Sequence, residues 1–130
     1  MKKWSIGIGA VSLVLAVAAL AVAPASMAKR GDVRVPGTCT GASTSKLKLS
    51  DEDGRIEVEF EVDQNRNGVR WNVVLLQNGR RIARMTRVTR RPSGSFEARI
   101  VAPNRTGRDA FRARAVTRSG EVCVARASFS

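Results

Sequence analysis

One stretch of the sequence has the spacing of a calcium-binding loop. Asp63, Asn65, Asn67 and Gly68 follow the pattern D-x-N-x-N-G, which opens the loop of EF-hand sites. Such a loop also needs a bidentate acid at its last liganding position, and that position here is Val74. Asn, Asp and Gly are also the residues that turn a chain between two strands. The pattern therefore predicts a turn, and we predict no metal site.

A row of glutamates is the second candidate for chemistry. Glu57, Glu59 and Glu61 alternate along one segment, and side chains two apart on a strand lie roughly 6 to 7 Å from each other. That separation suits a pair of catalytic carboxylates. A catalytic acid needs a pocket that shifts its pKa, however, and an open sheet face offers none. We expect these glutamates to form cross-strand ion pairs with basic residues of the neighbouring strands, Lys46, Lys48 and Arg99.

The sequence has few of the residues that nucleophilic or metal-assisted catalysis requires. The chain has no His and no Tyr, which removes the usual base beside a Ser or Cys and the usual zinc ligands. No glycine-rich phosphate loop is present. The sequence therefore predicts no catalytic residue, no cofactor and no enzymatic activity.

Arginine is the unusual part of the composition. The chain has 23 basic against 11 acidic residues, a formal net charge of +12. One segment supplies the candidate anion-binding group: Arg80, Arg81, Arg84, Arg87, Arg90 and Arg91. Arginines of neighbouring strands would extend the same face: Arg70, Arg112, Arg114 and Arg126. Guanidinium forks bind phosphate and carboxylate bidentately, so the expected ligand is an anionic polymer, whether a cell-wall polymer, nucleic acid or acidic polysaccharide. The alternative is that the charge serves solubility alone.

A candidate protein contact lies beside these arginines. A regular hairpin through Asn78-Gly79 would gather apolar side chains on the outer side of a sheet: Val74, Leu76, Ala83 and Met85. An apolar centre rimmed by arginine is typical of a protein-binding face or a homodimer contact. The alternative is that residues 29–43 fold across this surface.

The elements that must position these residues are short strands. Beyond residue 43 the pattern predicts seven of them: 46–50, 55–62, 69–77, 80–88, 95–101, 110–117 and 121–129. We expect an all-β, antiparallel, immunoglobulin-like sandwich, with the first, second and fifth strands in one sheet and the other four in the second. In the last hairpin, a three-residue loop over 118–120 is the register that buries the apolar side chains.

The N-terminal residues have the layout of a secretory signal peptide. A short basic start is followed by an apolar run over residues 6–22 and by the small residues of "APASMA", which predicts a signal helix removed after Ala28, with cleavage after Ala25 as the second choice. An uncleaved membrane anchor is the alternative. Three regions follow: the signal peptide (1–28), an extended segment carrying Cys39 (29–43) and the sandwich (44–130). The predicted location is extracellular, with no integral membrane segment after cleavage.

The two cysteines of the chain both lie in the exported part. In an oxidising compartment an isolated pair of cysteines forms a disulfide, so we predict the bridge Cys39–Cys123. It would join the start of the domain to its last strand.

Four segments together resemble small exported bacterial proteins with immunoglobulin- or fibronectin III-like sandwiches. They are the signal peptide, "PGTCTGAS", "LKLSDEDGRIEVEFEVDQNR" and "GEVCVARASF". The resemblance covers the whole chain and implies a scaffold, and it carries over no functional residue. We expect an exported binding or structural module, with an anionic surface polymer or another exported protein as the partner; the sequence leaves the oligomeric state open.

Overall fold

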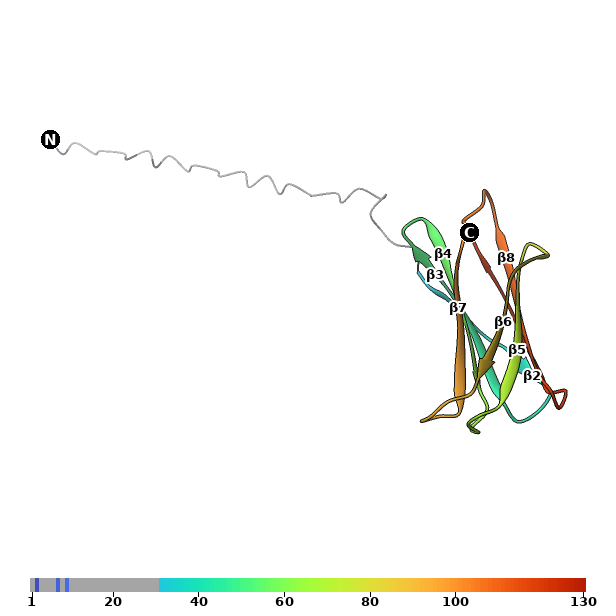
Figure 1. The fold of residues 1–130 in the computed structure, drawn as a ribbon. Helices are drawn as coiled ribbons and strands as arrows, with labels where there is room; N and C mark the ends of the chain where they lie inside the picture. The colour runs from blue at the N-terminus through green and yellow to red at the C-terminus, as the bar shows by residue number, and fades with distance from the viewer. Residues whose placement is uncertain (1, 3–6, 8, 10–30) are drawn as a thin grey trace.

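The computed structural model describes residues 31–130 together with residues 2, 7 and 9, and the rest of the predicted signal peptide lies outside the described residues. The described part is an all-β sandwich (Figure 1). Its strands are β1 (Val33–Pro36), β2 (Thr38–Cys39), β3 (Thr44–Glu52), β4 (Arg55–Asp63), β5 (Arg70–Gln77), β6 (Arg80–Val88), β7 (Ser95–Ala102), β8 (Asp109–Thr117) and β9 (Val122–Phe129). The seven predicted strands are present, and β1 and β2 bring the number described to nine rather than seven. No helix in that part of the chain has the length and hydropathy needed to cross a membrane.

The strands form two antiparallel sheets. The four-stranded sheet has the order β1-β3-β4-β7, and the five-stranded sheet has the order β2-β9-β8-β5-β6. Figure 1 shows the two layers, with β3 and β4 on one side and β5 and β8 on the other. The predicted division of the seven long strands between two sheets is confirmed.

Strict alternation of apolar and polar residues is what places the core between the sheets. On β4, Ile56, Val58, Phe60 and Val62 are all buried, and the residues between them face outward. Trp71 of β5 is buried in the opposite layer, and its ring centroid lies 5.9 Å from that of Phe96 on β7. Alanines of β8 and β9 complete the core on the same layer: Ala113, Ala115, Ala125 and Ala127.

The β8–β9 hairpin has the predicted register. Ala113 pairs with Ala125 and Ala115 with Cys123, so the apolar side chains of both strands face the core. Gly120 takes a φ of 98° at the end of the loop, a left-handed conformation that glycine adopts without steric cost.

The register predicted for β5–β6 is wrong beyond the turn. Gln77 faces Arg80 across the Asn78-Gly79 turn as expected, but a β-bulge between Leu75 and Leu76 then adds one residue to β6. The additional residue reverses which side of β6 faces the core. Ala83 and Met85 consequently pack against the interior.

The N-terminal segment does not fold across the outer side of the five-stranded sheet. It pairs first with β3 as strand β1 and then, after Gly37, with β9 as strand β2. A Cβ on Gly37 would lie 2.8 Å from the carbonyl oxygen of Val124, so glycine permits this close passage from one sheet to the other. The predicted disulfide Cys39–Cys123 is present and links β2 to β9 within one sheet.

Candidate anion-binding face

The segment with calcium-loop spacing is a turn between β4 and β5. The Asp63 carboxylate accepts a hydrogen bond from the backbone N–H of Asn65 at 3.1 Å, and Asn65 has a left-handed φ of 56°. The Thr89 hydroxyl holds the far end of the turn, where it accepts a hydrogen bond from the Val69 N–H at 2.9 Å. Among the described residues, no group of three or more His, Cys, Asp or Glu side chains is arranged to hold a metal ion, here or elsewhere.

The glutamate row lies on the outer face of the four-stranded sheet and is paired with basic residues, as predicted. We call this surface the paired face. Its ion pairs are Lys46–Glu61 at 3.6 Å, Lys48–Glu59 at 3.5 Å, Arg99–Glu59 at 3.9 Å and Arg99–Glu57. These carboxylates bind neighbouring side chains and leave little unbalanced charge for a ligand.

The pKa values of the two central glutamates move in opposite directions. The Arg99 guanidinium, hydrogen-bonded to Glu57, lowers the pKa of that carboxyl to about 2, and the hydrogen bond between Glu57 and Glu59 acts in the same direction. The same hydrogen bond, and then burial, raises the pKa of Glu59. Arg99 thus stabilises the charged form of one member of a carboxyl pair on an open sheet.

The outer face of the five-stranded sheet carries arginines in two neighbouring rows. In the first row Arg126 lies opposite Arg112, Arg112 opposite Leu76, and Leu76 opposite Arg81. In the second row the order across the same strands is Val124, Arg114, Val74 and Arg84. We call this surface the basic face and define it by its five arginines: Arg81, Arg84, Arg112, Arg114 and Arg126.

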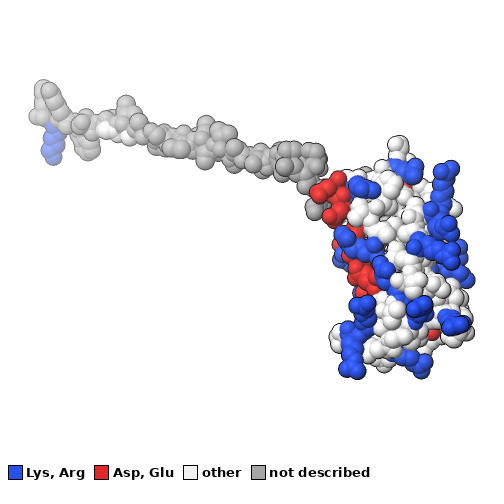
Figure 2. Space-filling view, viewed as in Figure 1, with Lys and Arg blue, Asp and Glu red and all other residues white. Residues whose placement is uncertain are grey.

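No carboxylate balances the basic face. Alternation on β5, β6, β8 and β9 places no Asp or Glu at an outward position. In the part of the chain that the structure describes, none of the five guanidinium groups forms an ion pair. Figure 2 shows the contrast: most of the acidic atoms gather on the side of β3 and β4, whereas basic atoms run down the side of β5 and β8.

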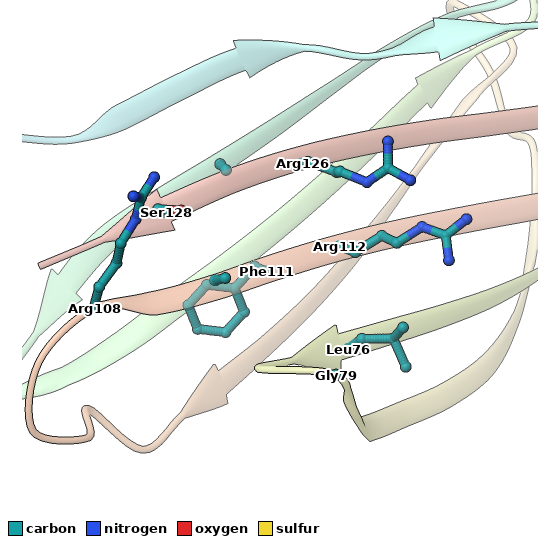
Figure 3. Close-up of a pocket in the computed structure, with 9 residues that line it drawn as sticks. Leu76, Gly79, Arg108, Phe111, Arg112, Arg126 and Ser128 are labelled. Atoms are coloured by element: carbon teal, nitrogen blue, oxygen red, sulfur yellow. The ribbon is translucent and has the colours of Figure 1, made fainter.

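Arg112 and Arg126 are the closest like charges of this face. They are directly opposite on adjacent strands, and their side chains lie side by side in Figure 3. Like charges in that position are destabilising. The Nε atom of Arg112 is also buried without a hydrogen-bond partner among the described residues. An anion bound between the two guanidinium groups would relieve the repulsion between them.

The structure brings together only two of the six arginines predicted from residues 80–91. Arg81 and Arg84 belong to the basic face. Arg87 lies on the other side of β6, half-buried, and its Nε donates to the carbonyl oxygen of Glu97 at 3.2 Å. Arg80 lies at the hairpin turn, and the remaining two, Arg90 and Arg91, lie in the β6–β7 connection. A strand with a turn at each end cannot present all its arginines on one surface.

The apolar group predicted as a protein contact is also divided. Val74 and Leu76 are outward and half-buried, between the arginines of β6 and β8. Ala83 and Met85 face inward because of the bulge. A single outward surface made of all four residues does not form.

A groove that the sequence did not indicate lies at one end of the basic face. It has a volume of about 700 Å³ and is lined by Leu76, Gly79, Arg108, Ala110, Phe111, Arg112, Arg126, Ala127 and Ser128. Figure 3 shows Arg108 at one end and the guanidinium groups of Arg112 and Arg126 pointing toward the other. Its floor is mainly apolar, and the guanidinium groups of three arginines surround this nonpolar surface.

The buried carboxylate of Asp109 fixes the walls of this groove. Asp109 is 0% exposed and accepts hydrogen bonds from Gln77 Nε2 at 2.9 Å and Asn78 Nδ2 at 3.1 Å. Its second oxygen accepts the backbone N–H of Arg105 at 3.0 Å. The β5–β6 hairpin and the loop before β8 are therefore held to the same anchor.

The basic face can attract and bind anions, because it presents unbalanced guanidinium groups at fixed spacing. The chain matches no protein-family model, and neither the curated proteins nor the solved structures include a significant match to it.

Proposed function

We propose that the protein is a binding module that recognises an anionic macromolecule through the basic face, and that it acts without catalysis. The observation that carries this proposal is the unbalanced set of five outward arginines, two of them directly opposite each other. Charge needed only for solubility does not require arginines placed directly opposite each other on a sheet face without an acid, an arrangement that costs stability.

The scaffold of this module is of the immunoglobulin or fibronectin III kind in this proposal. Support comes from the way the seven long strands divide, with β3, β4 and β7 in one layer and β9, β8, β5 and β6 in the other. In such sandwiches, the positions of β3, β4 and β7 correspond to strands A, B and E. Those of β9, β8, β5 and β6 correspond to strands G, F, C and C′. In this assignment β1 and β2 are additions at the N-terminal end.

Action outside the cytoplasm is part of the proposal. The disulfide Cys39–Cys123 is compatible with an oxidising compartment, and the start of the sequence has the layout of a signal peptide. A partner in that location is a polymer of the cell surface or another exported protein.

The test compares two triple variants with the same change of charge. Arg84→Gln/Arg114→Gln/Arg126→Gln removes exposed arginines of the basic face, and Arg66→Gln/Arg90→Gln/Arg118→Gln removes exposed arginines of turns. We expect wild-type binding to heparin and to DNA to weaken steeply with salt. The first variant should elute from heparin at a clearly lower salt concentration than the second. Equal elution of the two variants would mean that total charge, and not this face, binds the polymer.

A further inference from the structure

We propose that the ligand of the basic face is an acidic amphipathic helix of a partner protein, which lies along β5 between two ridges of arginine. This inference rests on the proposed function and names its ligand class. It follows from the positions of charged and aliphatic side chains on three neighbouring strands.

The basic face has the cross-section of a trough. β5 lies between β8 and β6, and its outward residues Val74 and Leu76 form an aliphatic floor. Arg112 and Arg114 of β8 stand on one side of that floor. Arg81 and Arg84 of β6 stand on the other side. Because neighbouring strands are about 4.8 Å apart, the two ridges are separated by roughly 10 Å.

An α-helix matches this trough in width and in charge spacing. Its diameter with side chains is about 10 to 12 Å. Residues four apart on a helix are separated by about 6 Å along the axis, and alternate residues of a strand by about 6.6 Å. A helix with a leucine stripe flanked by acids at i and i+4 would therefore place two carboxylates against each arginine ridge. Its stripe would cover Val74 and Leu76.

Other anionic partners fit the trough less well. Duplex DNA is about twice as wide as the space between the ridges, and single strands need aromatic side chains for stacking. The described aromatic residues are buried in the core. A flat membrane would meet the arginines first and leave the half-buried aliphatic floor uncovered. A second copy of the same face would set arginine against arginine.

The groove extends the trough toward the β5–β6 turn. Leu76 and Arg112 line both, and Arg108 lies at the other end of the groove. Beyond Leu76 and Gly79 its lining comes from β8, β9 and the loop before β8, so a helix on β5 would meet only the near end of the groove.

Two synthetic peptides of 18 residues test the inference. They have the same content of Leu, Ala, Glu and Gln; one has the leucines in a single stripe flanked by glutamates, and the other has them distributed around the helix. Fluorescence anisotropy with the disulfide-bonded protein should give at least tenfold tighter binding of the striped peptide. Arg114→Gln should weaken both peptides. Leu76→Asn should weaken the striped peptide alone.

Val74→Thr is a second variant for the case in which Leu76→Asn unfolds; it keeps the branched shape of the side chain but adds a hydroxyl to the floor, and it should also weaken only the striped peptide. Equal binding of the two peptides, or no effect of either floor variant, would overturn the inference. If heparin binding still depends on Arg84, Arg114 and Arg126, the proposed function survives that result. Binding to phosphatidylglycerol vesicles that depends on Leu76, without peptide binding, would instead assign the trough to a membrane. If the arginine variants bind heparin, DNA and both peptides as tightly as the wild type does, the proposed function itself fails.

Discussion

The outer faces of the two sheets are built on the same alternation of strand residues and yet use charge differently. On the paired face, Glu57, Glu59 and Glu61 lie among basic residues, and the charges neutralise one another. On the basic face, Arg112 lies opposite Arg126 with no acid nearby. The net charge of +12 belongs to the whole chain, and of these two sheet faces only the basic face carries arginines without acidic partners. The comparison is the basis of our proposal that the paired face contributes to stability and the basic face binds a ligand.

Removal of the disulfide is the largest change we predict, because it releases β2 from the edge of the five-stranded sheet. The bond spans 84 residues, and the chain-entropy model assigns such a closure about 4 to 5 kcal/mol. Cys39→Ala/Cys123→Ala should lower the free energy of unfolding in urea by up to that amount. Reduction of the wild-type protein should give the same midpoint as the variant. An unchanged midpoint in both experiments would show that the strands hold the segment without the bond.

An intermediate effect should appear on the paired face at low pH. The folded-state pKa of Glu57 is about 2, below its value in an unfolded chain, so its contribution to stability is present above about pH 4.3 and is lost as the pH falls toward 2. The raised pKa of Glu59 acts in the opposite sense. Its contribution to the free energy of unfolding is present at low pH and is lost as the pH rises through the pKa of Glu59 in the folded protein. We therefore expect a partial loss of stability between pH 4.3 and 2.

The variant Arg99→Gln sharpens this test, since Arg99 is the main cause of the lowered pKa of Glu57. Urea titrations at pH 6 and pH 2.5 should show a smaller loss in this variant than in the wild type. Lys46→Gln, which removes a cation that contacts Glu61 instead, should retain most of the loss. A loss of equal size in Arg99→Gln would contradict the role given to that residue.

The smallest effect comes from inverting one charge on each face. Arg126→Glu places a carboxylate opposite Arg112 and should raise the free energy of unfolding by about 0.2 to 1 kcal/mol at low salt. Lys48→Glu breaks the ion pairs with Glu59 and Asp32 and should lower it by a similar amount. Both differences should shrink in 0.5 M salt. A loss of stability in both variants would remove the contrast between the faces.

Much of the architecture could be predicted from local patterns. Period-two alternation located the long strands, the burial of alanines selected the β8–β9 register, and an isolated pair of cysteines indicated the bridge. The bulge in β5–β6 could not be predicted, because the strong Asn78-Gly79 turn also permits a regular hairpin. The only available sign was that Ala83 and Met85 are apolar and would otherwise have faced outward.

The arginine-rich character of the candidate site could be predicted from the sequence, but the particular residues that form it could not. Arginine density indicated an anion-binding surface, yet the face depends on which strands are neighbours and on which side each residue points. Arg112, Arg114 and Arg126 come from strands about thirty residues or more away from Arg81 in sequence. The walls of the groove are held by Asp109. Its burial results from contacts with residues distant in sequence, such as Gln77, so the local sequence pattern does not predict it.

The passage of the N-terminal segment from one sheet to the other also bears on self-association. Without β1 and β2, the long strands β3 and β9 would be edges with unpaired backbone groups, which are templates for aggregation. The segment replaces them with edges of four and two residues. On the opposite side of the sandwich, β6 is protected by its bulge and its arginines. Reducing conditions would therefore threaten the monodispersity of a concentrated sample by uncovering the β9 edge.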